Sequence, residues 1–238
     1  MRAIAALALG VLAAAGTAAA GTLGVAPVRA ELSSTASIAV VTVRNPADAA
    51  VVVQARPALW TQHEERDQLD ETHELLVTPP LFTIPPNGQQ TVRVALLRKP
   101  DPSRELDYRL VLSEVPPVAA PEGSELRVAL RITLPVFVKA ATSTSPDLSW
   151  HHTTLPDGTL RIEARNNGTA HLQVLALDVD TGHSQQPLHT DTARYLLPGS
   201  VAHWDLKSAR GAAPAAHLAI HGNSDAGDLN ATSEPGVQ

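Results

Sequence analysis

Histidine is the residue type in this chain with the clearest capacity for metal binding, because there are ten histidines and no cysteine. Two sets have suggestive spacing, the adjacent pair His151-His152 and the pair His217 and His221. On a β-strand His217 and His221 share a face but lie about 13 Å apart. Metal–nitrogen bonds of about 2.0–2.1 Å cannot bridge that gap, and adjacent strand residues point to opposite faces. The sequence therefore predicts no metal site.

Catalytic motifs are also missing from the chain. It contains no G-x-S-x-G, no P-loop and no H-E-x-x-H sequence. The lack of cysteine excludes thiol catalysis and Cys-based metal sites. The chain is therefore predicted to act by binding, without a cofactor and not as an enzyme.

The best candidate for binding is an alternating segment at 125–138. Its apolar side chains fall on one face of a strand: Leu126, Val128, Leu130, Ile132 and Leu134. The segment is longer than the usual five or six residues. It is either a half-buried sandwich strand or an edge that donates its apolar row to another chain. A proline-rich stretch at 116–124 precedes it, which a partner could order by extending the strand.

The elements that must position this segment are short strands bounded by proline, glycine and asparagine turns. Strands are expected at 37–44, 51–55, 90–96 and 108–115, and again at 148–152, 160–165, 170–179, 193–197, 200–206 and 216–221. No sustained helical periodicity occurs beyond the first residues. A polar break at 141–146 divides the chain. The expected organisation is a first sandwich at 21–140, a second at 141–225 and a flexible tail at 226–238.

The first twenty residues resemble a signal peptide cut near Gly21, with Arg2, an apolar run and Ala18-Ala19-Ala20. A membrane anchor is the alternative, which the lack of a flanking basic cluster disfavours. The net charge is −6, or about −7 without Arg2. This acidic balance argues against binding to nucleic acid or to anionic membranes.

A set of motifs gives the first domain a resemblance to a known family. These motifs are Asn45-Pro46, Trp60, LLVTPPLFTIPPNG at 75–88, QTVRV at 90–94, Tyr108-Arg109-Leu110 and EVPP at 114–117. In order and spacing they resemble the periplasmic chaperones of chaperone–usher pili. The resemblance covers nearly all of the first domain and is weak over the second.

This resemblance implies an all-β fold of two immunoglobulin-like sandwiches set at an angle, with a cleft between them. It also implies donor-strand complementation in the periplasm, in which the chaperone's seventh strand fills the open groove of a pilus subunit before delivery to an outer-membrane usher. The residues that match the inserted row are Leu126, Val128, Leu130 and Ile132. Each buried aliphatic side chain contributes roughly 1.5–3 kcal/mol before ordering costs.

In the family, two basic side chains at the base of the cleft hold the subunit's C-terminal carboxylate. Arg29 matches the first, although a solvated surface arginine is the plainer interpretation. Pro135 stands where the family has a lysine, so Arg109 is the expected replacement and Arg131 the second choice. This departure resembles the divergent archaic branch that serves spore-coat-like pili.

Three charged residues, Glu105, Lys139 and Asp225, match an interdomain ion-pair network of the family. The alternative function is a structural or adhesive β-sandwich component of a pilus. Such a subunit should carry a polymerising N-terminal extension and lack a complete second sandwich. Self-association that caps the exposed strand in the free protein stays open.

Overall fold

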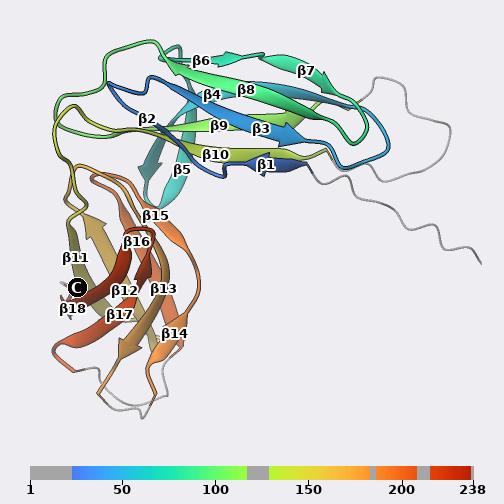
Figure 1. Ribbon diagram of the computed structural model, residues 1–238. Coiled ribbons are helices and arrows are strands. Elements are labelled where there is room, and N and C mark those ends of the chain that lie inside the picture. Colours follow the sequence, from blue (N-terminus) through green and yellow to red (C-terminus); the bar gives the residue numbers. More distant parts are fainter. Residues whose placement is uncertain (1–22, 117–128, 183–185, 208–214, 237–238) are drawn as a thin grey trace, which may run out of the picture.

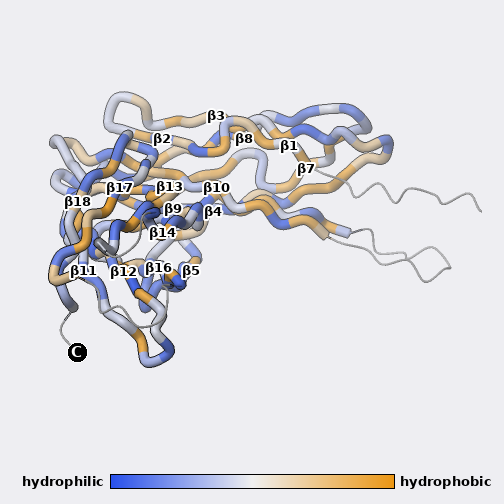
Figure 2. The backbone as a smooth tube through the Cα atoms, turned by 90° about the horizontal axis from the view of Figure 1, so that it is seen from below, coloured by the Kyte–Doolittle hydropathy of each residue, from blue (hydrophilic) through white to orange (hydrophobic). Residues whose placement is uncertain are grey.

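The computed structural model describes residues 23–116, 129–182, 186–207 and 215–236, which form two β-sandwiches joined in an L-shape (Figure 1). Their secondary structure consists of strands β1 to β18. In these ranges no helix has the length and apolar character needed to cross a membrane. Hydrophobic stretches recur along the strands of both sandwiches (Figure 2).

The first sandwich contains two sheets with a shared core. One sheet is ordered β1-β3-β8-β6, with the bounds Gly24–Ala26, Ile38–Arg44, Gln89–Leu96 and Leu75–Thr78. The other is ordered β2-β10-β9-β4-β5, with the bounds Ala30–Leu32, Arg131–Val138, Leu106–Glu114, Val51–His63 and Arg66–Glu71, and β7 (Leu81–Ile84) pairs with β4. Alternate residues of the strands other than β5 enter the core, as period-two patterns require.

The second sandwich has the strand order β14-β13-β17-β18-β11-β12-β16, with β15 paired to β13. The bounds in this order are Leu188–Thr190, Leu172–Asp180, Leu218–Ser224, Gly227–Pro235, Leu148–Thr154, Thr159–Asn166 and Val201–Lys207, with β15 at Arg194–Leu196. Its core includes Trp150 and Trp204, whose stacked rings lie 5.9 Å apart. The predicted class, an all-β protein of two immunoglobulin-like sandwiches, is confirmed.

The expected flexible tail at 226–238 is wrong for most of its length. Residues Gly227–Pro235 form β18. Its residues 227–233 pair with β17, and Glu234 and Pro235 pair with His151 and His152 in the middle of β11. Leu229 and Ser233 turn toward the interior, and Ser233 is fully buried and hydrogen-bonded to Nδ1 of His152 at 2.9 Å. The segment folds because neighbouring strands supply hydrogen-bond partners for its backbone N–H and C=O groups. Its polar composition does not reveal this pairing.

A small apolar cluster packs between the two sandwiches. Trp60, Phe137 and Leu197 are buried there, with Tyr195 packed edge-on to Trp60 at 5.3 Å. Gln62 of β4 adds two bonds to the second domain: its side-chain amide donates to the Tyr195 carbonyl and accepts from the Leu197 amide. These contacts fix the two sandwiches relative to one another.

Candidate functional site

Strand β10 lies between β2 and β9 but is covered unevenly. It pairs with β9 along its whole length, whereas β2 pairs only with Val136, Phe137 and Val138. Within the part of the chain that the structure describes, the stretch from Arg131 to Leu134 therefore has no strand partner on its β2 side. An unpaired edge is a template for another chain.

The predicted donor row runs along this edge. Ile132 is half-buried and packs against the first core, on the same face as the buried Leu134 and Val136. Leu130 is half-buried, and its carbonyl accepts a hydrogen bond from the Glu114 amide at 2.9 Å, so the pairing with β9 extends beyond Arg131. Leu126 and Val128, the other two predicted donors, lie outside the described residues.

The two predicted anchor cations flank Pro135 on the opposite face of this sheet. Pro135 lies directly across the ladder from Arg109, and Val136 pairs with Ala30, which places Arg29 beside Pro135 on the other side. Two strand spacings separate the backbones of Arg29 and Arg109, a distance of about 10 Å. Arg131 shares the face but lies four residues along β10, about 13 Å from Pro135. The structure thus brings Arg29 and Arg109 together and leaves Arg131 apart.

Arg29 is bound to carboxylates at the domain junction. Its Nη1 lies 2.6 Å from Oδ2 of Asp225 in the second domain, and its Nη2 lies 3.5 Å from Oε1 of Glu31. Its side chain is 34% exposed. The guanidinium is therefore accessible and already placed for a carboxylate.

Arg109 is held between aromatic rings and one carboxylate. Its guanidinium carbon lies 3.5 Å from the centre of the Trp60 ring and 5.4 Å from that of Tyr195, while Nη2 lies 3.5 Å from Oδ2 of Asp67. The side chain is only 11% exposed. Burial lowers the pKa of Arg109, which is opposed by the nearby Asp67. A desolvated guanidinium with one weak partner gains much from a second carboxylate.

The predicted ion-pair residues belong to a larger chain of charges than the sequence indicated. Nζ of Lys139 lies 2.6 Å from Glu31, a residue that the sequence analysis had not included. Glu105 and Asp225 do not touch Lys139; both instead bind His171, through Nδ1 at 2.5 Å and Nε2 at 3.4 Å. No motif marks His171, because its partners lie in distant parts of the sequence.

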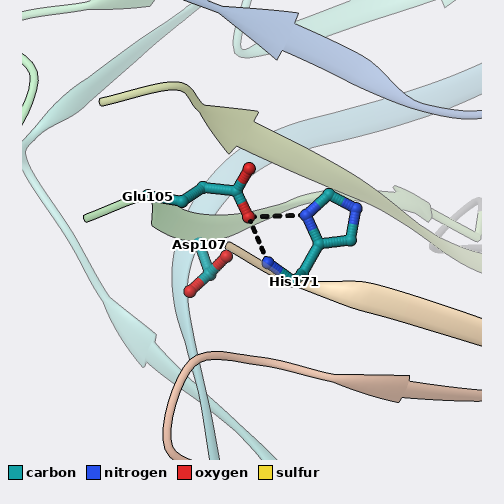
Figure 3. A group of neighbouring side chains, drawn as sticks. All are labelled: Glu105, Asp107 and His171. Atoms are coloured by element: carbon teal, nitrogen blue, oxygen red, sulfur yellow. Dashed lines mark hydrogen bonds and ion pairs between the residues drawn. The ribbon is translucent and has the colours of Figure 1, made fainter. Parts of the chain in front are cut away.

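His171 is the central charged group of the junction. Burial alone would lower its pKa, but hydrogen bonds to Asp225 and Glu105 outweigh burial and raise the pKa to about 9. Its ring also stacks on Phe137 with centres 3.5 Å apart. Asp107 lies beside Glu105 and His171 (Figure 3), and burial raises its pKa to about 8, with Glu105 adding to the effect.

The sequence of the first domain decides the family. Residues 22–142, about half of the chain, match the family model described as the pili and flagellar-assembly chaperone, PapD N-terminal domain. The chain belongs to this chaperone family. The matched residues include Arg29, Arg109 and all of β10.

Curated members of similar sequence match only a segment. The chaperone protein FaeE of Escherichia coli is 41% identical over 71 residues, which are 29% of this chain and 27% of FaeE. The chaperone protein ClpE of Escherichia coli is 39% identical over 71 residues, 29% of this chain and 26% of ClpE. The chain thus matches about a quarter of the length of these relatives.

Solved chaperone structures share the whole fold. The complex of CsuC with the tip adhesion subunit CsuE, from archaic Csu pili of Acinetobacter baumannii, matches with a TM-score of 0.65 and 19% identity, covering 90% of this chain and 98% of that one. The Salmonella enterica complex of SafA pilin with the SafB chaperone matches with a TM-score of 0.62 and 16% identity, covering 90% and 96%. The likeness extends over both sandwiches.

Proposed function

We propose that this chain is a periplasmic chaperone that binds pilus subunits by donor-strand complementation, stabilises them and delivers them to an outer-membrane usher. The observation that carries the proposal is the free edge of β10 from Arg131 to Leu134. The predicted donor row of apolar side chains runs along this edge. Membership of the chaperone family supports it. The chain acts by binding, not by catalysis.

The mechanism is β-augmentation. A subunit strand pairs with the free backbone groups of β10, so affinity grows with the length of the ladder. Leu126, Val128, Leu130 and Ile132 enter the subunit's groove as alternate plugs. Each plug that becomes fully buried contributes roughly 1.5–3 kcal/mol before ordering costs. The row thereby covers the edge through which a free subunit would aggregate.

Arg29 and Arg109 are the proposed anchor for the subunit's C-terminal carboxylate. Each guanidinium already binds a carboxylate, so the subunit's carboxylate displaces Asp225 from Arg29 and joins Asp67 at Arg109. Hydrogen bonds between charged groups contribute about 1.5–3 kcal/mol each. Fixing the terminal carboxylate also fixes the register of the subunit strand on β10.

Two features support the proposal that this chaperone binds the subunits of an archaic, spore-coat-like pilus. Proline occupies position 135, and Arg109 lies directly opposite it in the ladder. The cation is thus supplied by β9 in place of β10. An adhesive or structural pilus component is disfavoured, because the chain has two complete sandwiches and matches solved chaperones over nearly their whole length.

Co-expression with a pilus subunit from the same gene cluster tests the proposal. The chaperone should co-purify with the subunit as a discrete 1:1 complex in size-exclusion chromatography. Arg29→Ala should cripple this capture while the circular dichroism spectrum stays that of the native fold. Failure to form any 1:1 complex with any subunit of the cluster would contradict the function, and normal capture by Arg29→Ala would contradict the anchor.

A further inference from the structure

Three metal-ligating side chains from both domains meet at the domain junction. Glu105 immediately precedes β9, Asp107 is its second residue, and His171 immediately precedes β13 of the second sandwich. Residues two apart on a strand share a face, so both carboxyl groups point toward the histidine (Figure 3). One ligand atom from each residue can be chosen so that all three lie within 4.8 Å of one another. Sequence spacing does not predict this group, because its histidine lies more than sixty residues from its carboxylates.

Asp107 has unmet bonding capacity inside this group. The residue is only 6% exposed, and its Oδ1 has no hydrogen-bond partner in the described part of the chain. A buried oxygen without a partner is costly. Its neighbour Glu105 is also buried, at 4% exposed. Glu105 is bonded to Nδ1 of His171, so the unmet bond in the group belongs to Asp107.

His171 is oriented as a metal-binding histidine would be. Its Nε2 points to Oδ2 of Asp225 at 3.4 Å, which leaves Nδ1 facing Glu105. Asp225 is itself held by the Gln173 amide at 2.8 Å and by Arg29 at 2.6 Å. A carboxylate behind the far nitrogen fixes the ring and its tautomer, as is usual around ligating histidines.

We propose that Glu105, Asp107 and His171 form a zinc site that joins the two sandwiches. One imidazole and two carboxylates form a donor set that suits Zn²⁺, with water in the fourth position. Tetrahedral bonds of about 2.0–2.1 Å place ligand atoms about 3.3–3.4 Å apart. The three ligand atoms now lie within 4.8 Å of one another, and Nδ1 of His171 and Oε1 of Glu105, 2.5 Å apart, would move apart to admit the ion.

A Zn²⁺ ion would bring two positive charges to a group that contains two buried carboxyl groups. Because Glu105 and Asp107 belong to the first sandwich and His171 to the second, the ion cross-links the domains at their junction. The site borders the proposed anchor, because Asp225 contacts both His171 and Arg29 and the His171 ring stacks on Phe137 of β10. Zinc binding by the free chain needs no pilus subunit, so it can be tested independently of the proposed function.

Isothermal titration of chelator-stripped protein with ZnCl₂ tests this site. The wild-type chain should bind one ion per chain in a saturable step. Asp107→Asn and His171→Gln should each weaken that step by at least about tenfold. The control His189→Ala removes an exposed histidine paired with Asp178, and it should leave the step unchanged.

Asp107→Asn keeps the size and shape of the aspartate side chain, so its fold should survive. A melting temperature equal to or above that of the metal-free wild type checks this. Zinc should raise the melting temperature of the wild type but not that of Asp107→Asn, because only a ligand of the native state stabilises it. Absence of a saturable step, or equal zinc affinity in wild type and Asp107→Asn, would overturn the proposal.

Discussion

At the scale of single residues, Pro135 changes how a carboxylate can be held. A lysine there would place its ammonium on β10, whereas the proposed anchor cations are Arg109 of β9 and Arg29, which immediately precedes β2. Arg29 is one-third exposed and Arg109 is nearly covered by Trp60. The two guanidinia therefore differ: one is an accessible partner, and the other is a desolvated charge fixed by packing.

Replacing Arg109 tests the second anchor. Arg109→Gln should lower the affinity for a peptide carrying a subunit's C-terminal sequence by about 10–100-fold, the effect of losing a charged hydrogen bond of about 1.5–3 kcal/mol. Surface plasmon resonance measures this loss. Arg131→Gln is the matched control and should bind normally. The assignment of Arg109 is wrong if Arg131→Gln destroys binding while Arg109→Gln retains it.

His152 gives the second sandwich a pH dependence. Burial lowers its pKa, and the nearby His217 and His151 act in the same direction. A histidine whose folded pKa lies below its unfolded value contributes stability above the unfolded pKa, about 6.5, that is lost as pH falls. The melting temperature should therefore drop between pH 7.5 and pH 5.

Replacement by glutamine isolates this contribution. His152→Gln can retain the bond to Ser233 and should show a smaller drop over the same range, measured by differential scanning fluorimetry. The control His151→Gln changes an adjacent residue on the opposite face of β11. An identical pH dependence in wild type and His152→Gln would show that the buried imidazole is not responsible.

At the scale of elements, the sequence predicted most of the longer alternating strands but missed β5, β6, β7, β14 and β18. The row from Leu130 to Leu134 was visible because apolar and polar residues alternate through it. Strand β18 was not, because Leu229 is its one large apolar residue and Asn230 and Glu234 interrupt it. Its stability comes from pairing with β17 and β11, a long-range fact that local composition does not encode.

Truncation tests the importance of β18. A chain that ends at Ala226 should lose the cooperative unfolding of the second sandwich, because β17 and β11 would lose their shared neighbour. Differential scanning calorimetry should show the second domain's transition weakened or absent. A chain that ends at Gly236 is the control and should unfold as wild type. An unchanged thermogram for the shorter chain would show that β18 is dispensable.

At the scale of the whole molecule, the two sandwiches meet through packing and a branched set of ion pairs. The family resemblance predicted Glu105, Lys139 and Asp225 as members of such a network. It did not predict His171, which links Glu105 to Asp225, nor Glu31, which binds Lys139. Those partners depend on how the domains dock, and strand patterns within one domain carry no information on docking.

Trp60 should be the main apolar link between the domains. Trp60→Ala should cost about 3–5 kcal/mol, because it removes a buried ring that packs on Phe137 and Tyr195 and supports Arg109. Urea unfolding should then split into two transitions. The control Leu81→Ala truncates a residue that is 58% exposed and should unfold as wild type. A single unshifted transition in Trp60→Ala would contradict this role.

The most direct test of donor-strand binding compares two neighbouring aspartates. Leu130→Asp places a charge in the proposed row, and Ala129→Asp places the same charge on the opposite face of the same segment. We predict that Leu130→Asp abolishes the 1:1 complex with a pilus subunit in size-exclusion chromatography, while Ala129→Asp retains it and both variants melt as wild type. Equal complex yield from the two variants would contradict the account.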